Sequence, residues 1–219
     1  MEFCGPYVIA VKPNLLQVYL VPANAYVNDT PRQCSTHMET FTLPEKNFRS
    51  ASLSVLSINA DDSTSMSVTL CLADPFDVVL HYLLCLPCDP GALFSLTAIL
   101  LGTDTSLAAR GVFIGSELAL SPRGTRAAWI EKSRHSLERR VVAFTAGNKS
   151  NTDASEAPQI RTSHVYLTSS NDSSEDIVNL DFDDLTGRIV LGTRGGDLWV
   201  LDCWQRPPLE RKPLARFCN

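Results

Sequence analysis

The sequence lacks several features that would assign it directly to a functional class. Its 219 residues include 19 lysines and arginines against 24 aspartates and glutamates, which gives a net charge of −5. This balance lacks the basic surplus that nucleic-acid-binding domains carry, so we expect no nucleic-acid partner. No long stretch shows the 3.6-residue apolar repeat of an amphipathic helix, which argues against a helical fold.

Long uninterrupted apolar runs and an export signal are also absent. The most apolar region, residues 78–101, is broken at its middle by Pro87-Cys88-Asp89-Pro90-Gly91, and each half is too short to span a bilayer. We predict a buried hairpin there instead of a membrane helix. The N-terminus has Glu2 where a signal peptide needs positive charge. We therefore expect an intracellular protein, cytoplasmic or nuclear, without a membrane partner.

Motifs for phosphate binding and for acyl transfer are missing. Neither GxxxxGK nor GxGxxG occurs, and there is no GxSxG nucleophile elbow. The histidines are scattered along the chain, at His37, His81, His135 and His164. Because His81 lies inside an apolar run, we expect a core or edge residue there and not a ligand. We predict no catalytic, cofactor-binding or metal-binding residues, no cofactor, and no enzymatic activity.

Cysteine usage excludes a disulfide framework. The seven cysteines are odd in number and irregularly spaced, which favours reduced thiols inside a cell. The one paired motif is Cys85-Leu86-Pro87-Cys88. A redox pair needs a helix N-terminus behind it and a zinc site needs a second pair, and the sequence offers neither. We expect structural cysteines beside a hairpin turn, with metal binding and redox chemistry as the alternatives.

Three polar stretches are predicted to be surface loops. They lie near residues 22–50, 146–163 and 169–176. Within the first, Phe41 and Leu43 are candidates to anchor the connection. The basic residues Arg134, Arg139 and Arg140, and the acidic loop around Ser173 and Ser174, are most simply solvated loop charge. The alternatives are a contact surface or, at Ser173, phosphorylation ahead of two acidic residues.

What the sequence does contain is a repeated β-pattern, clearest from Ile177 to Asp202. Leu180 and Phe182 alternate with polar residues, as in a strand with one buried face. A second apolar run follows Gly187, and the glycines of Arg194-Gly195-Gly196-Asp197 suit a tight hairpin turn. We predict three antiparallel strands here, with Trp199, like Trp129 further up the chain, in or near the core.

Similar hairpins begin near residues 7, 78, 126 and 187, so about four units are present. Residues 161–168 are predicted to be a further outer strand. The intervals fit compact four-stranded blades with loop insertions. We therefore predict an all-β fold over residues 1–219, a single β-propeller-like domain of about four antiparallel meander blades. Because residue 7 enters what looks like the last two strands of a blade, we expect a partial or shortened propeller.

Three phrases resemble the C-terminal WD40-like propeller of fungal F-box proteins: GPYVIAVKPNLLQVYLVP, LALSPRGTRAAWIE and LDFDDLTGRIVLGTRGGDLWVLD. The resemblance implies a propeller that serves as a protein-interaction scaffold, related to substrate-recognition regions. No F-box is present, so binding to a ubiquitin-ligase adaptor is not implied. Leu201-Asp202 and Cys203-Trp204 stand where WD40 repeats have Trp-Asp. We expect an unknown protein partner; the alternative is a ligand-binding or catalytic propeller that uses polar residues at the channel end.

Overall fold

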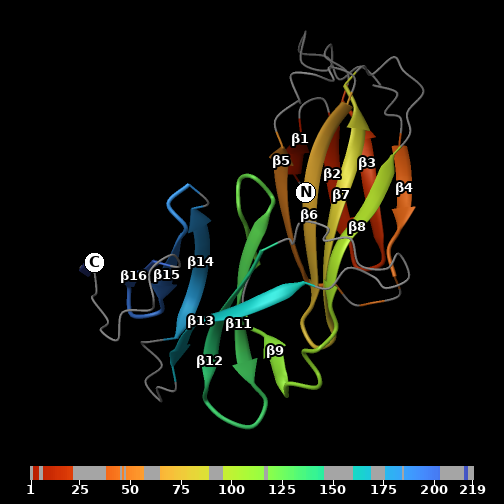
Figure 1. Ribbon diagram of the computed structural model, residues 1–219. Coiled ribbons are helices and arrows are strands. Elements are labelled where there is room, and N and C mark those ends of the chain that lie inside the picture. Colours follow the sequence, from red (N-terminus) through yellow and green to blue (C-terminus); the bar gives the residue numbers. More distant parts are fainter. Residues whose placement is uncertain are drawn as a thin grey trace, which may run out of the picture.

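The computed structural model describes residues 2–4, 7–21, 38–44, 46, 48–56, 65–88, 96–115, 118–145, 160–168, 176–183, 185–202 and 215–216. Every regular element in these residues is a β-strand (Figure 1). The strands form four antiparallel sheets that follow one another along the chain. The predicted all-β fold with about four meanders is therefore confirmed. None of these residues forms a helix long and apolar enough to cross a membrane.

The first two sheets contain four strands each, in the order of the sequence. The first sheet consists of β1 (Glu2–Cys4), β2 (Tyr7–Lys12), β3 (Leu15–Leu20) and β4 (Met38–Thr42). The second consists of β5 (Ser50–Leu56), β6 (Ser65–Asp74), β7 (Val78–Pro87) and β8 (Thr97–Asp104). Since β7 and β8 pair antiparallel, the apolar region 78–101 is a hairpin, as predicted.

The third and fourth sheets repeat this layout. The third consists of β10 (Ala119–Leu120), β11 (Arg126–Ser133), β12 (Arg139–Thr145) and β13 (Arg161–Thr168), and β9 (Val112–Ile114) also pairs with β11. The fourth consists of β14 (Ile177–Asp183), β15 (Arg188–Thr193), β16 (Asp197–Asp202) and β17 (Ala215–Arg216). Positive φ angles of 68° and 90° at Gly187 and Gly196 close the two turns of the fourth sheet.

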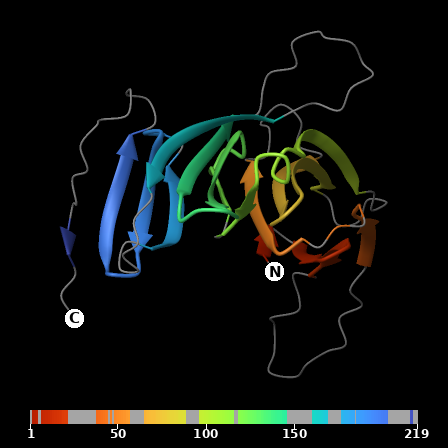
Figure 2. The same ribbon diagram turned by 90° about the horizontal axis from the view of Figure 1, so that it is seen from below.

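The sheets stack face to face in chain order, and apolar clusters join each neighbouring pair (Figure 2). Alternation along β6 shows how one strand serves two interfaces: Leu70 and Leu72 pack toward the first sheet, whereas Cys71 and Ala73 pack toward the third. Burial on both faces explains why β7 is nearly continuously apolar. The third sheet packs on the fourth through residues such as Ile130.

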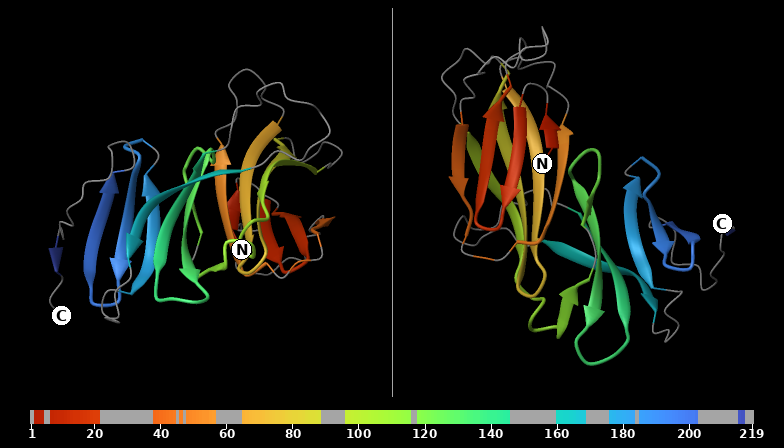
Figure 3. Two further views of the ribbon diagram at one scale, coloured as in Figure 1. Left: turned by 60° about the horizontal axis from the view of Figure 1, so that its bottom comes forward. Right: turned by 180° about the vertical axis from the view of Figure 1, so that it is seen from behind.

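This stack of successive meanders is the architecture of propeller blades. The first and fourth sheets lie at opposite ends of the row (Figure 2 and Figure 3). The described residues thus form a partial propeller with four blade-like sheets. Trp129 is fully buried and Trp199 packs against the cluster between the third and fourth sheets, as expected.

Two details of the first sheet and its loops differ from expectation. Residues 7–20 form the second and third strands of their sheet, because β1 precedes them and β4 follows. β4 lies within the stretch 22–50, which was predicted to be a connection. Pairing of Phe41 with Leu16 holds β4 in the sheet, and Leu43 is buried behind it. Residues 161–168 form the predicted outer strand β13, while loop residues 22–37, 146–159 and 169–175 lie outside the described residues.

Candidate functional site

One end of the stack gathers the short turns of all four sheets, and we call it the turn end. It comprises the turns at 13–14, 75–77, 133–138 and 194–196 and the described residues that connect one sheet to the next at 43–49, 105–111 and 176. The turn end lies at the bottom of Figure 1. Contacts tie its turns to the connecting segments: Leu43 N–H donates to the Asn14 carbonyl within the first sheet, Lys46 pairs with Asp77 of the second, and Asp176 pairs with Arg194 within the fourth.

Cations outnumber carboxylates at the turn end and at its border with β2. Five cationic side chains are exposed there: Lys12, Lys46, Arg49, Arg134 and Arg194. The described carboxylates of this end are Asp77, Glu138 and Asp176, with side chains 45%, 38% and 15% exposed, and each of them pairs with a cation. Because the whole chain carries −5, the turn end is a local cationic surface on an acidic protein.

An exposed aromatic group, Phe76, lies in the β6–β7 turn of this end. The Phe76 side chain is 51% exposed, and its ring packs on Phe113 at a centroid distance of 5.9 Å. The Arg134 guanidinium lies 5.6 Å from the Phe76 ring centroid, and its Nη2 donates to the Phe76 carbonyl at 3.1 Å. Leu137, in the same turn as Arg134, is 56% exposed. We call Phe76, Phe113 and Arg134 the Phe76 patch, and we group with them Leu137, which is exposed three residues after Arg134 in the same turn.

Local sequence explains why Phe76 points outward. Asp74 Oδ1 accepts the Phe76 N–H at 3.0 Å, which fixes an aspartate-initiated turn through Pro75. The turn is tied to the third sheet because Ile114 N–H donates to the Pro75 carbonyl at 2.8 Å. Arg134 is held by a separate hydrogen bond, which its backbone N–H donates to the Gly111 carbonyl at 2.9 Å. The patch is therefore built on fixed backbone from two sheets.

A buried ionic cluster lies beneath the turn end, between the second and third sheets. Arg110 Nη2 contacts Asp104 Oδ2 at 3.1 Å and Glu131 Oε1 at 2.5 Å. Trp129 Nε1 donates to the same Glu131 oxygen at 3.2 Å. Burial raises the pKa of Asp104, but hydrogen bonds from Ser106 and Arg110 outweigh it and hold that pKa below its usual value. Burial alone would lower the Arg110 pKa, but the hydrogen bonds and charges of Asp104 and Glu131 outweigh it and hold that pKa above its ordinary value.

A second ionic cluster joins the third and fourth sheets around Asp176. Arg139 Nε lies 2.9 Å from Asp176 Oδ1, and Lys132 Nζ lies 3.8 Å from the same oxygen. Arg194 Nη2 approaches the other oxygen at 3.4 Å. The Arg139 side chain is only 16% exposed. Arg139 thus differs from the solvated loop charge that the sequence predicted, because Asp176 pairs with it between two sheets.

The remaining candidates from the sequence do not form a reactive site. Cys85 and Cys88 are half-buried free thiols, and the described residues contain no group of three or more His, Cys, Asp or Glu side chains that could hold a metal. His81 is 1% exposed and packs edge-on against Phe144 at 5.3 Å. Burial lowers the His81 pKa to about 4. Ser173, Ser174 and His37 lie outside the described residues.

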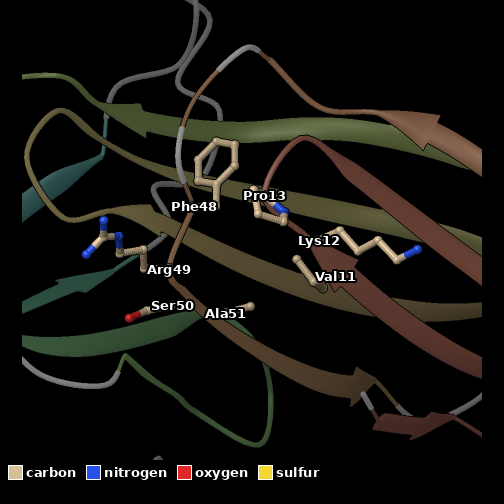
Figure 4. Close-up of a pocket in the computed structure, with 7 residues that line it drawn as sticks. All are labelled: Val11, Lys12, Pro13, Phe48, Arg49, Ser50 and Ala51. Atoms are coloured by element: carbon tan, nitrogen blue, oxygen red, sulfur yellow. The ribbon is translucent and has the colours of Figure 1, made fainter.

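A shallow pocket at the first two sheets shows no convergence of charge. Its lining consists of Val11, Lys12, Pro13, Phe48, Arg49, Ser50 and Ala51. Figure 4 shows the Lys12 and Arg49 side chains pointing away from each other. The pocket therefore does not bring its two cations onto one ligand, although both contribute to the charge of the turn end.

Sequence reasoning missed Phe76 and the ionic clusters. Phe76 carried a readable signal, since an aromatic residue between Pro75 and Asp77 stands in a turn and has no strand face to occupy. The Asp104–Arg110–Glu131 cluster carried none, because its members come from two sheets and meet only after folding.

Comparison with known proteins adds little to this geometry. No family model matches the chain, and no curated protein is similar to it. Among solved structures, "Crystal structure of Kluyvelomyces marxianus Hsv2" aligns with 94% of this chain and 62% of its own, at 10% identity and a TM-score of 0.35. The chain thus spans less than two thirds of that structure's length. None of these comparisons shows a relationship to F-box proteins. The geometry establishes four stacked antiparallel sheets with a cationic end that exposes an aromatic group.

Proposed function

We propose that the chain is a non-enzymatic protein-interaction module of the β-propeller type. The observation that carries this proposal is the turn end, where turns from four sheets form one surface with five exposed cations, described carboxylates that are each paired with a cation, and the half-exposed ring of Phe76. Arginine and aromatic side chains are enriched in the energetically important parts of protein interfaces. A cationic surface with apolar groups fits a protein partner of opposite charge.

The scaffold beneath this surface supports the same role. The second and third sheets are buried on both faces, and ionic clusters centred on Arg110 and Asp176 join neighbouring sheets directly under the turns. Short turns on a rigid base are ordered before binding, so less conformational entropy is lost when a partner docks. A preformed surface of this kind is suited to recognition.

The finer family assignment belongs to this proposal. The resemblance of three strand–turn–strand phrases to fungal WD40-like F-box propellers supports a role like that of their substrate-recognition regions. Adaptor binding is not proposed, because the sequence contains no F-box. We propose neither nucleic acid nor a membrane as the partner, since the overall charge is −5 and the turn end exposes the apolar ring of Phe76 beside the Arg134 guanidinium.

The alternative is a catalytic or ligand-binding propeller, which would need a convergent polar cluster open to substrate. Asp104, Arg110 and Glu131 do converge, but Glu131 is fully buried and Asp104 is 6% exposed. Arg110 contacts both carboxylates and Trp129 donates to the same Glu131 oxygen as Arg110, while Glu131 Oε2 and Arg110 Nε are buried without a hydrogen-bond partner among the described residues. We therefore assign this cluster to the joining of two sheets.

Affinity capture with charge-reversed baits tests the proposal. One bait carries Arg49→Glu and Arg134→Glu at the turn end, and the matched control carries Arg123→Glu and Arg188→Glu, which are also exposed but lie away from it. Proteins captured by the wild-type chain should be lost with the first bait and kept with the second. Identical capture by both baits, or loss with the control alone, would contradict a binding role for the turn end.

A further inference from the structure

We propose that the Phe76 patch binds an acidic segment of a partner protein in which a carboxylate lies next to an apolar side chain. This inference rests on the proposed function and makes it specific, because it names the surface and the chemistry of the bound segment. The patch combines one guanidinium that has no carboxylate partner among the described residues and two exposed apolar side chains, Phe76 and Leu137.

Charge complementarity points to a carboxylate ligand. Arg134 is exposed and makes no ion pair with any described residue; its recorded contacts are the Phe76 ring and carbonyl. The nearest acidic groups along the chain are already paired, Asp77 with Lys46 and Glu138 with Arg140. A guanidinium has five N–H donors, and within the described part of the chain one of those of Arg134 is engaged, by the Phe76 carbonyl. The remaining donors can bind a carboxylate in two-pronged geometry.

Exposed apolar area beside this cation indicates the second half of the ligand. Phe76 and Leu137 are 51% and 56% exposed, and Phe113 supports the Phe76 ring from beside it. An apolar ligand side chain that covers Phe76 would also shield the guanidinium above the ring from water. Removing water strengthens the contact between Arg134 and a carboxylate.

The patch needs little rearrangement to bind. Hydrogen bonds fix Phe76 through Asp74 and fix Arg134 through Gly111, and the turn carrying Phe76 is joined to β9 at Ile114. The two turns therefore hold the ring and the guanidinium in register before any ligand arrives. Preorganisation of this kind reduces the entropy lost on association.

The same geometry favours a peptide over a nucleic acid. The Arg134 guanidinium lies over the Phe76 ring, so a base would have to displace it in order to stack there. The patch holds a single unpaired cation, and the carboxylates of Asp77 and Glu138 flank it along the chain. A chain of phosphates would meet these carboxylates, whereas a peptide with one acidic and one apolar side chain need not.

Selection from a random peptide library displayed on phage tests this inference, with the purified full-length chain as the target. Enriched sequences should contain Asp or Glu within a few residues of Leu, Phe or Trp. A fluorescent peptide made from the consensus should bind on the order of tenfold more weakly to Arg134→Glu and to Leu137→Ser than to the wild-type chain. Binding to Arg188→Glu should be unchanged, since Arg188 lies at the other end of the sheets.

Controls separate the possible outcomes. Each variant is used only if its thermal midpoint equals that of the wild-type chain, and Phe76→Ser serves as a third patch variant. Failure to enrich acidic peptides, or equal binding to all variants, would overturn the inference. The inference would also be overturned if the wild-type chain bound a single-stranded oligonucleotide or phosphatidylserine vesicles instead of peptides, and if Arg134→Glu abolished that binding. In the capture assay, Arg49→Glu could lose the captured proteins while Phe76→Ser and Leu137→Ser retain them. That result would support the proposed interaction function but exclude the Phe76 patch as the binding site.

Discussion

Arg110 and Glu131 form an ion pair of 2.5 Å that joins the second sheet to the third. Arg110 belongs to the turn after β8, and Glu131 faces it from β11, where its side chain is fully buried. Asp104 holds the same guanidinium from the end of β8 at 3.1 Å. The turn end therefore rests on a buried charge network, and breaking that network should loosen the base on which Arg134 and Phe76 are displayed.

Replacement of Glu131 by alanine should destabilise the fold by about 3 kcal/mol, because it leaves a partly buried guanidinium with one carboxylate and removes the acceptor for Trp129 Nε1. Glu131→Gln should cost less, since it keeps an acceptor for the indole. Urea unfolding followed by Trp fluorescence measures both. As the matched control, Glu138→Ala removes the half-exposed pair with Arg140 and should cost less than about 1 kcal/mol. Equal losses for the two alanine variants would contradict the structural role of the buried cluster.

Acidification should destabilise the protein through His81. The folded-state pKa of His81 is about 4, below its ordinary value of 6.5, because the ring is buried. Between these values the unfolded chain binds the proton and the folded chain does not, so stability is complete above pH 6.5 and falls as the pH drops toward 4. The loss should reach about 3 kcal/mol near pH 4.

Urea unfolding at a series of pH values measures this loss. His81→Leu should flatten the pH dependence between pH 6.5 and 4, whereas His135→Gln, at an exposed position, should leave it unchanged. An unaltered slope in His81→Leu would show that other groups cause the acid sensitivity. The carboxyl of Asp104 has a lowered folded pKa, so its contribution is lost only at pH values below the ordinary pKa of 3.8.

Much of the fold could be predicted because its signals are local. The alternation of Leu180 and Phe182 with polar residues, and the glycine turns at 187 and 196, gave β14, β15 and β16 nearly to the residue. β4 escaped because Glu39-Thr40-Phe41-Thr42 is mostly polar, and its place in the sheet depends on pairing with β3. A strand held by non-local pairing leaves a weak local pattern.

The candidate site was less accessible to prediction for the same physical reason. Phe76 and Arg134 are separated by 58 residues and meet because two sheets stack. Asp176 was visible only as the end of an acidic loop, although it pairs with cations from β11, β12 and the β15–β16 turn. Charges that neutralise one another across sheets have no fixed spacing along the chain. Sequence reasoning therefore found the blades and missed the contacts between them.

Gly124 should be far less tolerant of alanine than Gly111. Both have positive φ, 64° and 65°, so an alanine at either position would be held in the unfavourable left-handed region. A Cβ at Gly124 would lie 1.8 Å from Thr69 Oγ1, whereas a Cβ at Gly111 would lie 3.5 Å from the His135 ring. Gly124→Ala should destabilise by roughly 3 kcal/mol and Gly111→Ala by about 1 kcal/mol. Thermal and urea unfolding of the pair measures the difference, and equal losses would place Gly124 farther from β6.

Thiol labelling should distinguish the interface between the second and third sheets from the C-terminal end of β7. Cys71 is fully buried opposite His81, and burial raises its thiol pKa, so both access and thiolate content are low. Cys85 and Cys88 are half-buried.

Under native conditions iodoacetamide should therefore modify Cys85 and Cys88 well before Cys71, as read by peptide mass spectrometry over time. In denaturant the three rates should converge, and Glu131→Ala should accelerate native labelling of Cys71 by loosening the same interface. Rapid native labelling of Cys71 in the wild-type chain would mean that the second and third sheets separate readily, and a rigid base for the turn end would then be excluded.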